Sequence, residues 1–365
     1  MAIALGKLVL GPVIDKIGGI QSLQIALSSL SLLLLVISAT QPFSVFAGAW
    51  ILVDFIFSSC WAGCINAIHQ SFPEHLWGQR IGILAAGART GNALAFAMFA
   101  SLLYALEGRM NQPWRTIFGV SALIQLVPLG LLTYFGRMTL QTHKDNEATI
   151  SIVTPDDRPS FHDTMVTLKR EAKTPEFWLH VLSRSALMVF ASFLLFVPTL
   201  LSQVYKASSG FAAQAGSIYA LGCLLSVTLG SQFYGKLTRK GQALTVSALM
   251  GGATLSSLMQ LAHVSGMFRL SAAASAASMF LWGFCFAIPF YIPPSLYALS
   301  RGGRASSATI SDVFDIGGFL LLAIFNGYVA SIEHANPAAW IPTFVTTTAC
   351  SLTSMISLTG AVLLQ

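Results

Sequence analysis

Apolar runs of about 20 residues recur along the whole chain, and only short polar segments separate them. A helix of that length crosses about 30 Å of hydrocarbon. Backbone polar groups inside a bilayer must find their partners within the spanning structure, so these runs predict helices, and the alternation of a β-barrel is absent. Charged residues make up only 9% of the sequence, against roughly a quarter in soluble proteins. We therefore expect an all-α integral membrane protein.

The apolar runs define eleven candidate spans. The first is too short to cross a bilayer alone, and no signal-peptide pattern precedes it. We expect the sequence to begin in the middle of this helix. We also expect that a further helix, the first of twelve, is missing before it. The spans cover about 1–14, 20–39, 44–68, 80–105, 114–136, 177–204, 211–235, 243–264, 270–299, 305–331 and 340–364.

Lys and Arg are distributed unevenly between alternate turns. If the turn at Lys16 is cytoplasmic, thirteen Lys and Arg lie near inner turns and four near outer turns. This bias predicts that the C-terminus and residues 137–175 are cytoplasmic. It also explains the net charge of +6 without a nucleic-acid partner. The five cysteines lie in apolar runs without metal-ligand spacing, so no metal or cofactor is expected.

A polar interval divides the chain into two halves. Residues 137–175 hold twelve of the thirty-four charged residues and predict a cytoplasmic linker. An N-terminal bundle over residues 1–136 and a six-helix bundle over residues 176–365 flank it. Each half contains a short cationic turn that follows a small residue, at Gly11–Gly18 and at Ser231–Lys240. Such internal repeats are typical of transporter folds.

The first cationic turn resembles the signature of the major facilitator superfamily, G-x-x-x-D-R/K-x-G-R/K-R/K, which joins the second and third helices. The resemblance implies two pseudo-symmetric helical bundles, and it covers the family's second to twelfth helices. The two trailing basic residues are replaced by Gly19 and Ile20. The residues that match are Gly11, Asp15, Lys16 and Gly18.

The second cationic turn keeps Lys236 and Arg239, but Gly235 stands where the signature has Asp. A carboxylate at a helix end can pair with nearby cations and face a neighbouring helix N-terminus. These residues are therefore candidates for a gate that holds one end of the carrier shut. The alternative is an ordinary polar turn.

Lys7 lies two turns before Asp15, inside an apolar run, where a charge is costly unless it faces a cavity or a partner. The segment from Gly6 to Asp15 is similar to the second helix of the organophosphate:phosphate antiporter family, which implies that Lys7 helps to bind a substrate phosphate. The alternative is a lysine that extends to the membrane surface.

Two arginines are expected near the middle of the membrane, Arg89 and Arg184. Arginine keeps its charge and suits carboxylates and phosphates. With Lys7 they would form an anion-binding cluster. The antiporter family also uses an arginine on its seventh helix, but Arg184 is several residues nearer the cytoplasm. Alternatively, Asp54 neutralises Arg89.

Asp312 and Asp315 lie two to three turns into one later span. They are candidates for closing the cytoplasmic gate on basic residues such as Lys16 or Arg80. Alternatively, Asp315 or Asp54 carries a proton that is coupled to transport.

No nucleotide-binding loop or catalytic constellation is present, so an enzyme is not expected. The interpretation is a secondary transporter that moves a small solute, most simply an anion such as a phosphate ester, by alternating access as a monomer. One alternative is a proton-coupled symporter of a carboxylate or neutral solute. Another is an inactive, truncated relative.

Overall fold

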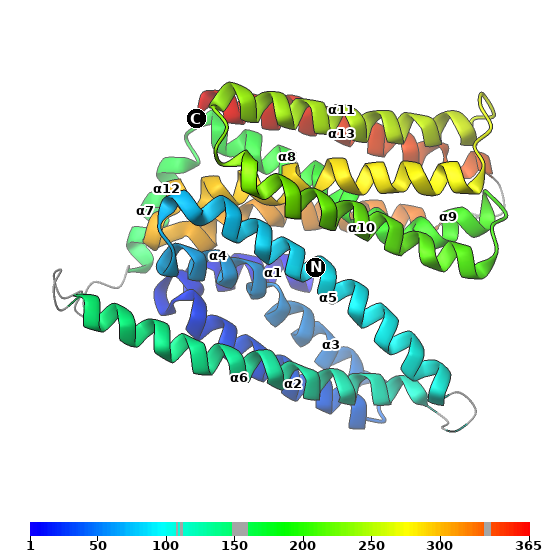
Figure 1. Ribbon diagram of the computed structural model, residues 1–365. Coiled ribbons are helices and arrows are strands. Elements are labelled where there is room, and N and C mark those ends of the chain that lie inside the picture. The colour runs from blue at the N-terminus through cyan, green and yellow to red at the C-terminus, as the bar shows by residue number, and fades with distance from the viewer. Residues whose placement is uncertain (107–108, 110–111, 148–159, 332–336) are drawn as a thin grey trace. The chain divides into compact units, whose positions relative to one another are not determined.

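A computed structural model describes residues 1–106, 109, 112–147, 160–331 and 337–365. All regular secondary structure within these ranges is helical (Figure 1). The all-α membrane fold predicted from the sequence is therefore confirmed. The chain divides into two compact units, which are described separately.

The first unit comprises Met1–Glu74, Leu94–Arg170 and Ala298–Val313. Within it, α2 packs along α6 and against α3 and α4, and α1 packs against α3 and α4 (Figure 1). Its helices are α1 (Ala2–Ile17), α2 (Gly19–Ala39), α3 (Phe43–Phe57), α4 (Ser59–Ser71), α6 (Pro113–Glu147) and most of α7 (Phe161–Glu171).

The second unit comprises His75–Ala93, Glu171–Tyr297 and Phe314–Gln365. Within it, α13 packs along both α8 and α11. The first part of α5 (Trp77–Leu106) belongs here, and α12 (Ala272–Ala330) contributes to both units. The other helices are α8 (Pro175–Phe193), α9 (Val197–Gln203), α10 (Ser209–Tyr234), α11 (Arg239–Val264) and α13 (Ile341–Leu364).

Short 3₁₀ turns connect several helices, at Glu74–Leu76, Leu194–Phe196 and Pro337–Trp340. The two compact units do not follow the predicted bundle boundaries, because parts of α5 and α12 group with the opposite half of the sequence. The division into residues 1–136, 137–175 and 176–365 stays a prediction.

Most predicted spans correspond to observed helices, and α2 matches within one residue. The span predicted at 44–68 is interrupted at Ser58, between α3 and α4. Among the described residues, eight helical segments are long and apolar enough to cross a membrane. The α1 helix, with 16 residues, is shorter than the roughly 20 that a full crossing needs.

The α12 helix has 59 residues, which is about 90 Å of helix and far more than one crossing requires. Its only non-helical backbone is at Gly303, where φ is +52°, in a region that favours glycine. The two spans predicted over this segment are therefore separated at Gly303. The helix continues through Pro289, Pro293 and Pro294.

Local capping explains where three helices of the second unit begin. The Ser208 hydroxyl accepts a hydrogen bond from the amide of Phe211 at the start of α10, and Thr238 and Ser271 cap α11 and α12 in the same way. A side-chain acceptor at this position satisfies an amide that has no partner within the helix.

Hydroxyl groups connect α11 to α13 inside the second unit. Ser247 bonds Thr359 at 2.8 Å, Thr254 bonds Ser351 at 2.8 Å, and Ser257 bonds Thr347 at 2.7 Å. These pairs lie along the two adjacent helices visible in Figure 1. In a bilayer the hydrophobic effect does not drive helices together, so packing and interhelical hydrogen bonds contribute to their association.

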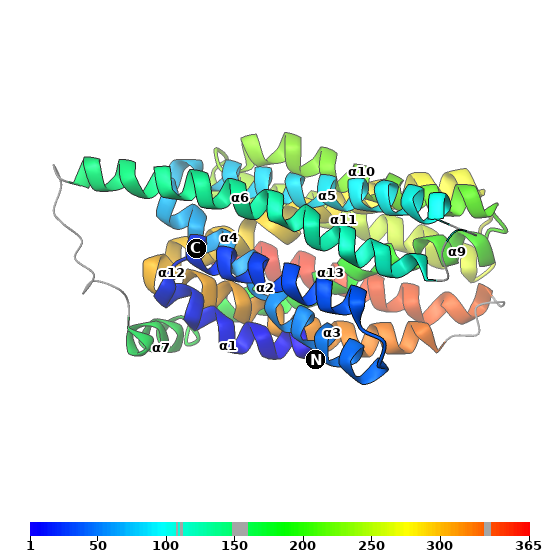
Figure 2. The same cartoon turned by 90° about the horizontal axis from the view of Figure 1, so that it is seen from below.

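Within the first unit, α7 lies beside the part of α12 that follows Gly303 (Figures 1 and 2). Its N-terminus is a capping box, in which Ser160 and Asp163 exchange hydrogen bonds. Thr164 joins it to the segment after Gly303, by donating to the Ala305 carbonyl at 2.7 Å and accepting from Ser306 at 3.2 Å. The predicted linker therefore contains an ordered helix.

Candidate functional site

The carboxylate of Asp15 is buried at the end of α1 and accepts four hydrogen bonds within the first unit. Three come from α12, from the amides of Ala308 at 3.0 Å and Thr309 at 2.9 Å and from the Thr309 hydroxyl at 2.6 Å. These donors follow the break at Gly303. The carboxylate thus faces backbone amides close to a helix N-terminus, the kind of partner that the sequence analysis described for this turn.

The fourth donor to Asp15 is Asn66, which the sequence analysis missed. The fully buried Asn66 amide donates to Asp15 at 3.0 Å and to the Ser307 hydroxyl at 3.3 Å, and its oxygen accepts from the amide of Gly19 at 2.8 Å. Asn66 therefore connects α1, α2, α4 and α12. A carboxamide in the middle of the apolar α4 was the available signal, but attention to charged residues passed over it.

Gly11 and Gly18 allow this part of the first unit to pack closely. Gly18 has φ +94° at the turn between α1 and α2. A Cβ on Gly11 would lie 3.1 Å from both the Asp312 carboxylate and the Thr309 Cα. Lys16 is exposed to solvent and has no ion pair among the described residues.

Lys7 is buried and forms an ion pair with Asp312. Its ammonium lies 2.8 Å from the Asp312 carboxylate and donates a second bond, of 3.2 Å, to the carbonyl of Ser58. Ser58 is the residue at which α3 and α4 are interrupted. Only 4% of Lys7 and 1% of Asp312 are exposed. In the first unit Asp312 therefore engages Lys7 and not Lys16.

Arg184 and Asp315 form a second buried ion pair, inside the second unit. The Arg184 Nε lies 2.6 Å from the Asp315 carboxylate. The guanidinium also stacks over the Phe290 ring, 3.5 Å from its centroid, and donates to the Phe290 carbonyl. Pro294 has no amide hydrogen to offer that carbonyl four residues earlier, so the proline leaves it free for Arg184.

Arg89 is buried in the second unit but has no carboxylate partner among the described residues. Its guanidinium lies 5.4 Å from the centroid of the Tyr291 ring, and it is 7% exposed. Tyr219 and Cys223 of α10 also lie near it. Arg89 therefore differs from Lys7 and Arg184, because aromatic and neutral groups surround its charge.

Four further predicted site residues lie on α3, on α5 and around the turn between α10 and α11. Asp54 is half-buried in α3 of the first unit, and Arg80 is half-buried in α5 of the second. Lys236 and Arg239 are exposed around the turn between α10 and α11. The second cationic turn is thus open to solvent, whereas the first buries its carboxylate. The roles predicted for these residues stay predictions.

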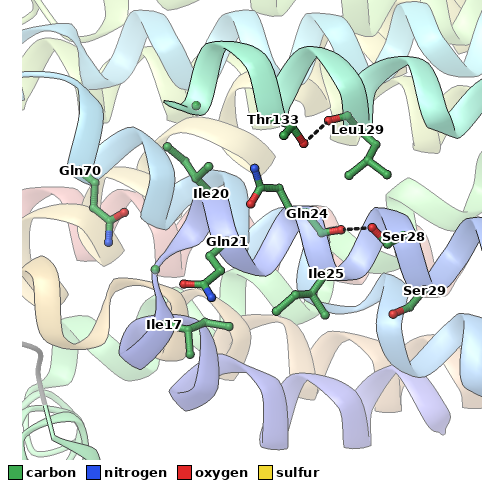
Figure 3. A pocket seen from close by; sticks show the side chains of 12 residues that line it. Ile17, Ile20, Gln21, Gln24, Ile25, Ser28, Ser29, Gln70, Leu129 and Thr133 are labelled. Carbon is green, nitrogen blue, oxygen red and sulfur yellow. Dashed lines mark hydrogen bonds between the residues drawn. The ribbon is translucent and has the colours of Figure 1, made fainter. Parts of the chain in front are cut away.

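The structure also contains a cavity of about 780 Å³ in the first unit, between α2, α6 and the end of α4 (Figure 3). Of the predicted site residues, only Gly18 lines it. Among the described residues, no group of three or more His, Cys, Asp or Glu side chains is arranged to hold a metal ion.

Apolar spanning helices and buried ion pairs together define a polytopic membrane protein with charged groups inside its spans, the arrangement found in membrane carriers. The comparison with protein families places the chain more narrowly. Residues 1–326 match the model of the Major Facilitator Superfamily, and the chain belongs to this family. It is therefore a multi-pass transporter of small-molecule solutes and not an enzyme.

Solved structures agree on the fold. The chain is similar to FucP in the outward conformation, with a TM-score of 0.62 and 12% identity, over 98% of this chain and 89% of FucP. A second structure of FucP, described as the E. coli fucose:proton symporter, gives a TM-score of 0.61 and 14% identity, over 99% of this chain and 87% of that one.

The proton:xylose symporter XylE, bound to 6-bromo-6-deoxy-D-glucose, gives a TM-score of 0.65 and 15% identity, over 96% of this chain and 83% of XylE. At these identities the similarity shows the fold alone. A search of curated protein sequences finds no match.

Proposed function

We propose that this transporter is a proton-coupled symporter of a small organic carboxylate, working by alternating access. Arg89 binds the carboxylate of the solute, and Asp315 carries the coupled proton. The observation that carries the proposal is the pairing of the three buried cations. Lys7 and Arg184 are each neutralised by an aspartate, whereas Arg89 has no anionic partner in the described residues.

A buried guanidinium without a counter-ion is costly, and a bound anion reduces that cost. The flat faces of Arg89 and Tyr291 suit a planar carboxylate, which can accept two parallel hydrogen bonds from arginine. Of the three buried cations, Arg89 alone has no aspartate beside it within the described residues, and one such charge favours a solute with one negative charge over a doubly charged phosphate ester.

Asp315 supports the coupling part of the proposal. Its carboxylate is held by Arg184, and protonation would remove the charge that makes this contact strong. A reversible change of this kind lets a proton change the contacts of α12. Both FucP and XylE are described as proton symporters, which supports proton coupling in this transporter as well. Asp54, half-buried in α3, is the other candidate proton site.

A second candidate is the exchange of phosphate esters for phosphate, as in the antiporter family that the Lys7 segment resembles. Three basic side chains in the spans, each at least nine-tenths buried, favour it. In this mechanism the substrate would replace Asp312 and Asp315 as the partner of Lys7 and Arg184. The carrier would function as a monomer, with residues 137–175 in the cytoplasm.

Transport by the purified chain in proteoliposomes distinguishes these candidates. Uptake of labelled lactate, benzoate, hexose and hexose phosphate is measured with and without an inward proton gradient. Exchange is measured in vesicles preloaded with phosphate or with the same solute. We expect carboxylate uptake that requires the gradient.

Two variants test the assigned roles. Asp315→Asn should abolish gradient-driven uptake while exchange of the carboxylate continues. Arg89→Gln should raise KM roughly tenfold to hundredfold, the effect of losing one charge-assisted contact. Arg269→Gln, in an exposed loop, is the matched control. If hexose phosphate exchanges for phosphate at the same rate with and without the proton gradient, the result would contradict symport and favour the second candidate.

A further inference from the structure

The cavity in the first unit has a polar lining, although it lies between spanning helices. Its polar side chains come from α2, α4 and α6, and none of the described residues lining it is charged. Figure 3 shows these side chains together with isoleucines of α1 and α2 and with Leu129. The six polar residues are Gln21, Gln24, Ser28, Ser29, Gln70 and Thr133.

The hydrogen-bonding groups of this lining are partly used and partly available. Ser28 and Thr133 donate to backbone carbonyls of their own helices, both at 2.8 Å, so their hydroxyls can only accept from a ligand. The amides of Gln21, Gln24 and Gln70 have no hydrogen-bond partner within the described residues. An amide both donates and accepts, and a ligand hydroxyl does the same. Several hydroxyl groups therefore fit this lining.

The cavity extends along α2 from Ile20 to Ser29, which corresponds to about 14 Å of helix. That distance reaches from the helix end, where headgroups lie, into the hydrocarbon of one leaflet. Only 6% of the apolar part of α6 is buried within the protein, so most of this helix can contact lipid. Val127 and Leu131 of α6 are 62% and 53% exposed. An acyl chain could pack on these residues while its headgroup occupies the cavity.

We propose that this cavity binds a membrane lipid whose headgroup is uncharged and carries several hydroxyls, such as a glycosyl diacylglycerol. No cation among the described lining residues neutralises a phosphate, and six polar side chains exceed what a single hydroxyl needs. This site is separate from the transport site proposed above, and its test measures binding without transport.

Lipid retention by the purified full chain tests the proposal. The protein is incubated in detergent with equal amounts of monohexosyl diacylglycerol and phosphatidylcholine with the same acyl chains, and bound lipid is counted by native mass spectrometry. We expect at least fivefold preference for the glycolipid. Replacing both Gln24 and Gln70 by Leu should lower its retention about tenfold, the effect of losing two hydrogen bonds of ordinary strength.

Two further variants make the result specific. Ser29→Phe fills the cavity without removing an amide and should also reduce retention. Gln41→Leu removes an exposed glutamine just beyond the other end of α2, and should leave retention unchanged. Equal retention of the two lipids by the unmodified chain would overturn the proposal. Full competition by a soluble methyl hexoside would overturn it too, because the acyl chains would then contribute nothing.

Discussion

The ammonium of Lys7 lies 2.8 Å from the carboxylate of Asp312, although 305 residues separate them in the sequence. Both side chains are almost completely buried. Two buried charges in such a pair stabilise a protein only while both are present, because either one alone keeps its desolvation cost and loses its partner.

The first prediction concerns that pair. Asp312→Asn should lower the free energy of unfolding by about 3–5 kcal/mol, because Lys7 stays buried without its counter-ion. Replacing Lys7 by Met and Asp312 by Leu together should recover most of the loss. Thermal unfolding in detergent measures all three proteins. A double variant as unstable as Asp312→Asn would show that shape, and not charge, determines the effect.

The second prediction concerns Asn66, which donates to Asp15 and accepts from Gly19. Asn66→Ala leaves buried polar atoms without partners, and we expect a loss of about 1–3 kcal/mol for each atom that water cannot reach. Asn66→Asp should be worse, because it sets a second carboxylate beside Asp15. Unfolding midpoints in detergent provide the comparison. Equal stability of Asn66→Asp and the unmodified protein would contradict this account.

The third prediction concerns the contact between α5 and α10 inside the second unit. A Cβ on Gly82 would lie 2.1 Å from the Cβ of Ser231, so Gly82→Ala should force the two helices apart. Gly87→Ala is the matched control, because nothing lies within 4 Å of that position. Labelling of a cysteine introduced at Val227, one turn from Ser231, measures the separation. We expect more labelling in Gly82→Ala than in Gly87→Ala.

Removing the opposing side chain should reverse the effect. In the protein with Gly82→Ala and Ser231→Gly the overlapping atoms are gone, so labelling should return to the level of the unmodified contact. Labelling that stays high in this double variant would mean that the overlap does not cause the separation.

The fourth prediction concerns pH and α7. The amide and hydroxyl of Ser160 hold the pKa of the exposed Asp163 carboxyl below its usual range. The stability that these bonds give α7 is therefore present above the ordinary aspartate pKa of about 4 and is lost as the pH falls through the lowered pKa. Hydrogen exchange of the α7 amides, measured between neutral pH and pH 2–3, follows this loss. Ser160→Ala should move the loss of α7 protection to higher pH. An exchange profile that Ser160→Ala leaves unchanged would contradict the role of the capping box.

The sequence predicted the helices well, because the length of an apolar run is a local property that the bilayer thickness constrains. The bounds of α2 and α13 agree with the predicted spans to within one residue, and the signature around Asp15 predicted the family. Lys7, Arg184, Asp312 and Asp315 could all be selected as candidates, because a charge inside an apolar run is conspicuous.

Only the tertiary structure decided which of these charges meet. In their respective units Asp312 pairs with Lys7 and Asp315 pairs with Arg184, and the sequence did not indicate these pairings. The gating role of the aspartates with Lys16 or Arg80 stays a prediction. The backbone of α12 leaves the helical region at Gly303, and Pro294 frees the Phe290 carbonyl for Arg184. Partner choice depends on how helices distant in sequence rotate and pack, and the polarity of a single helix does not contain that information.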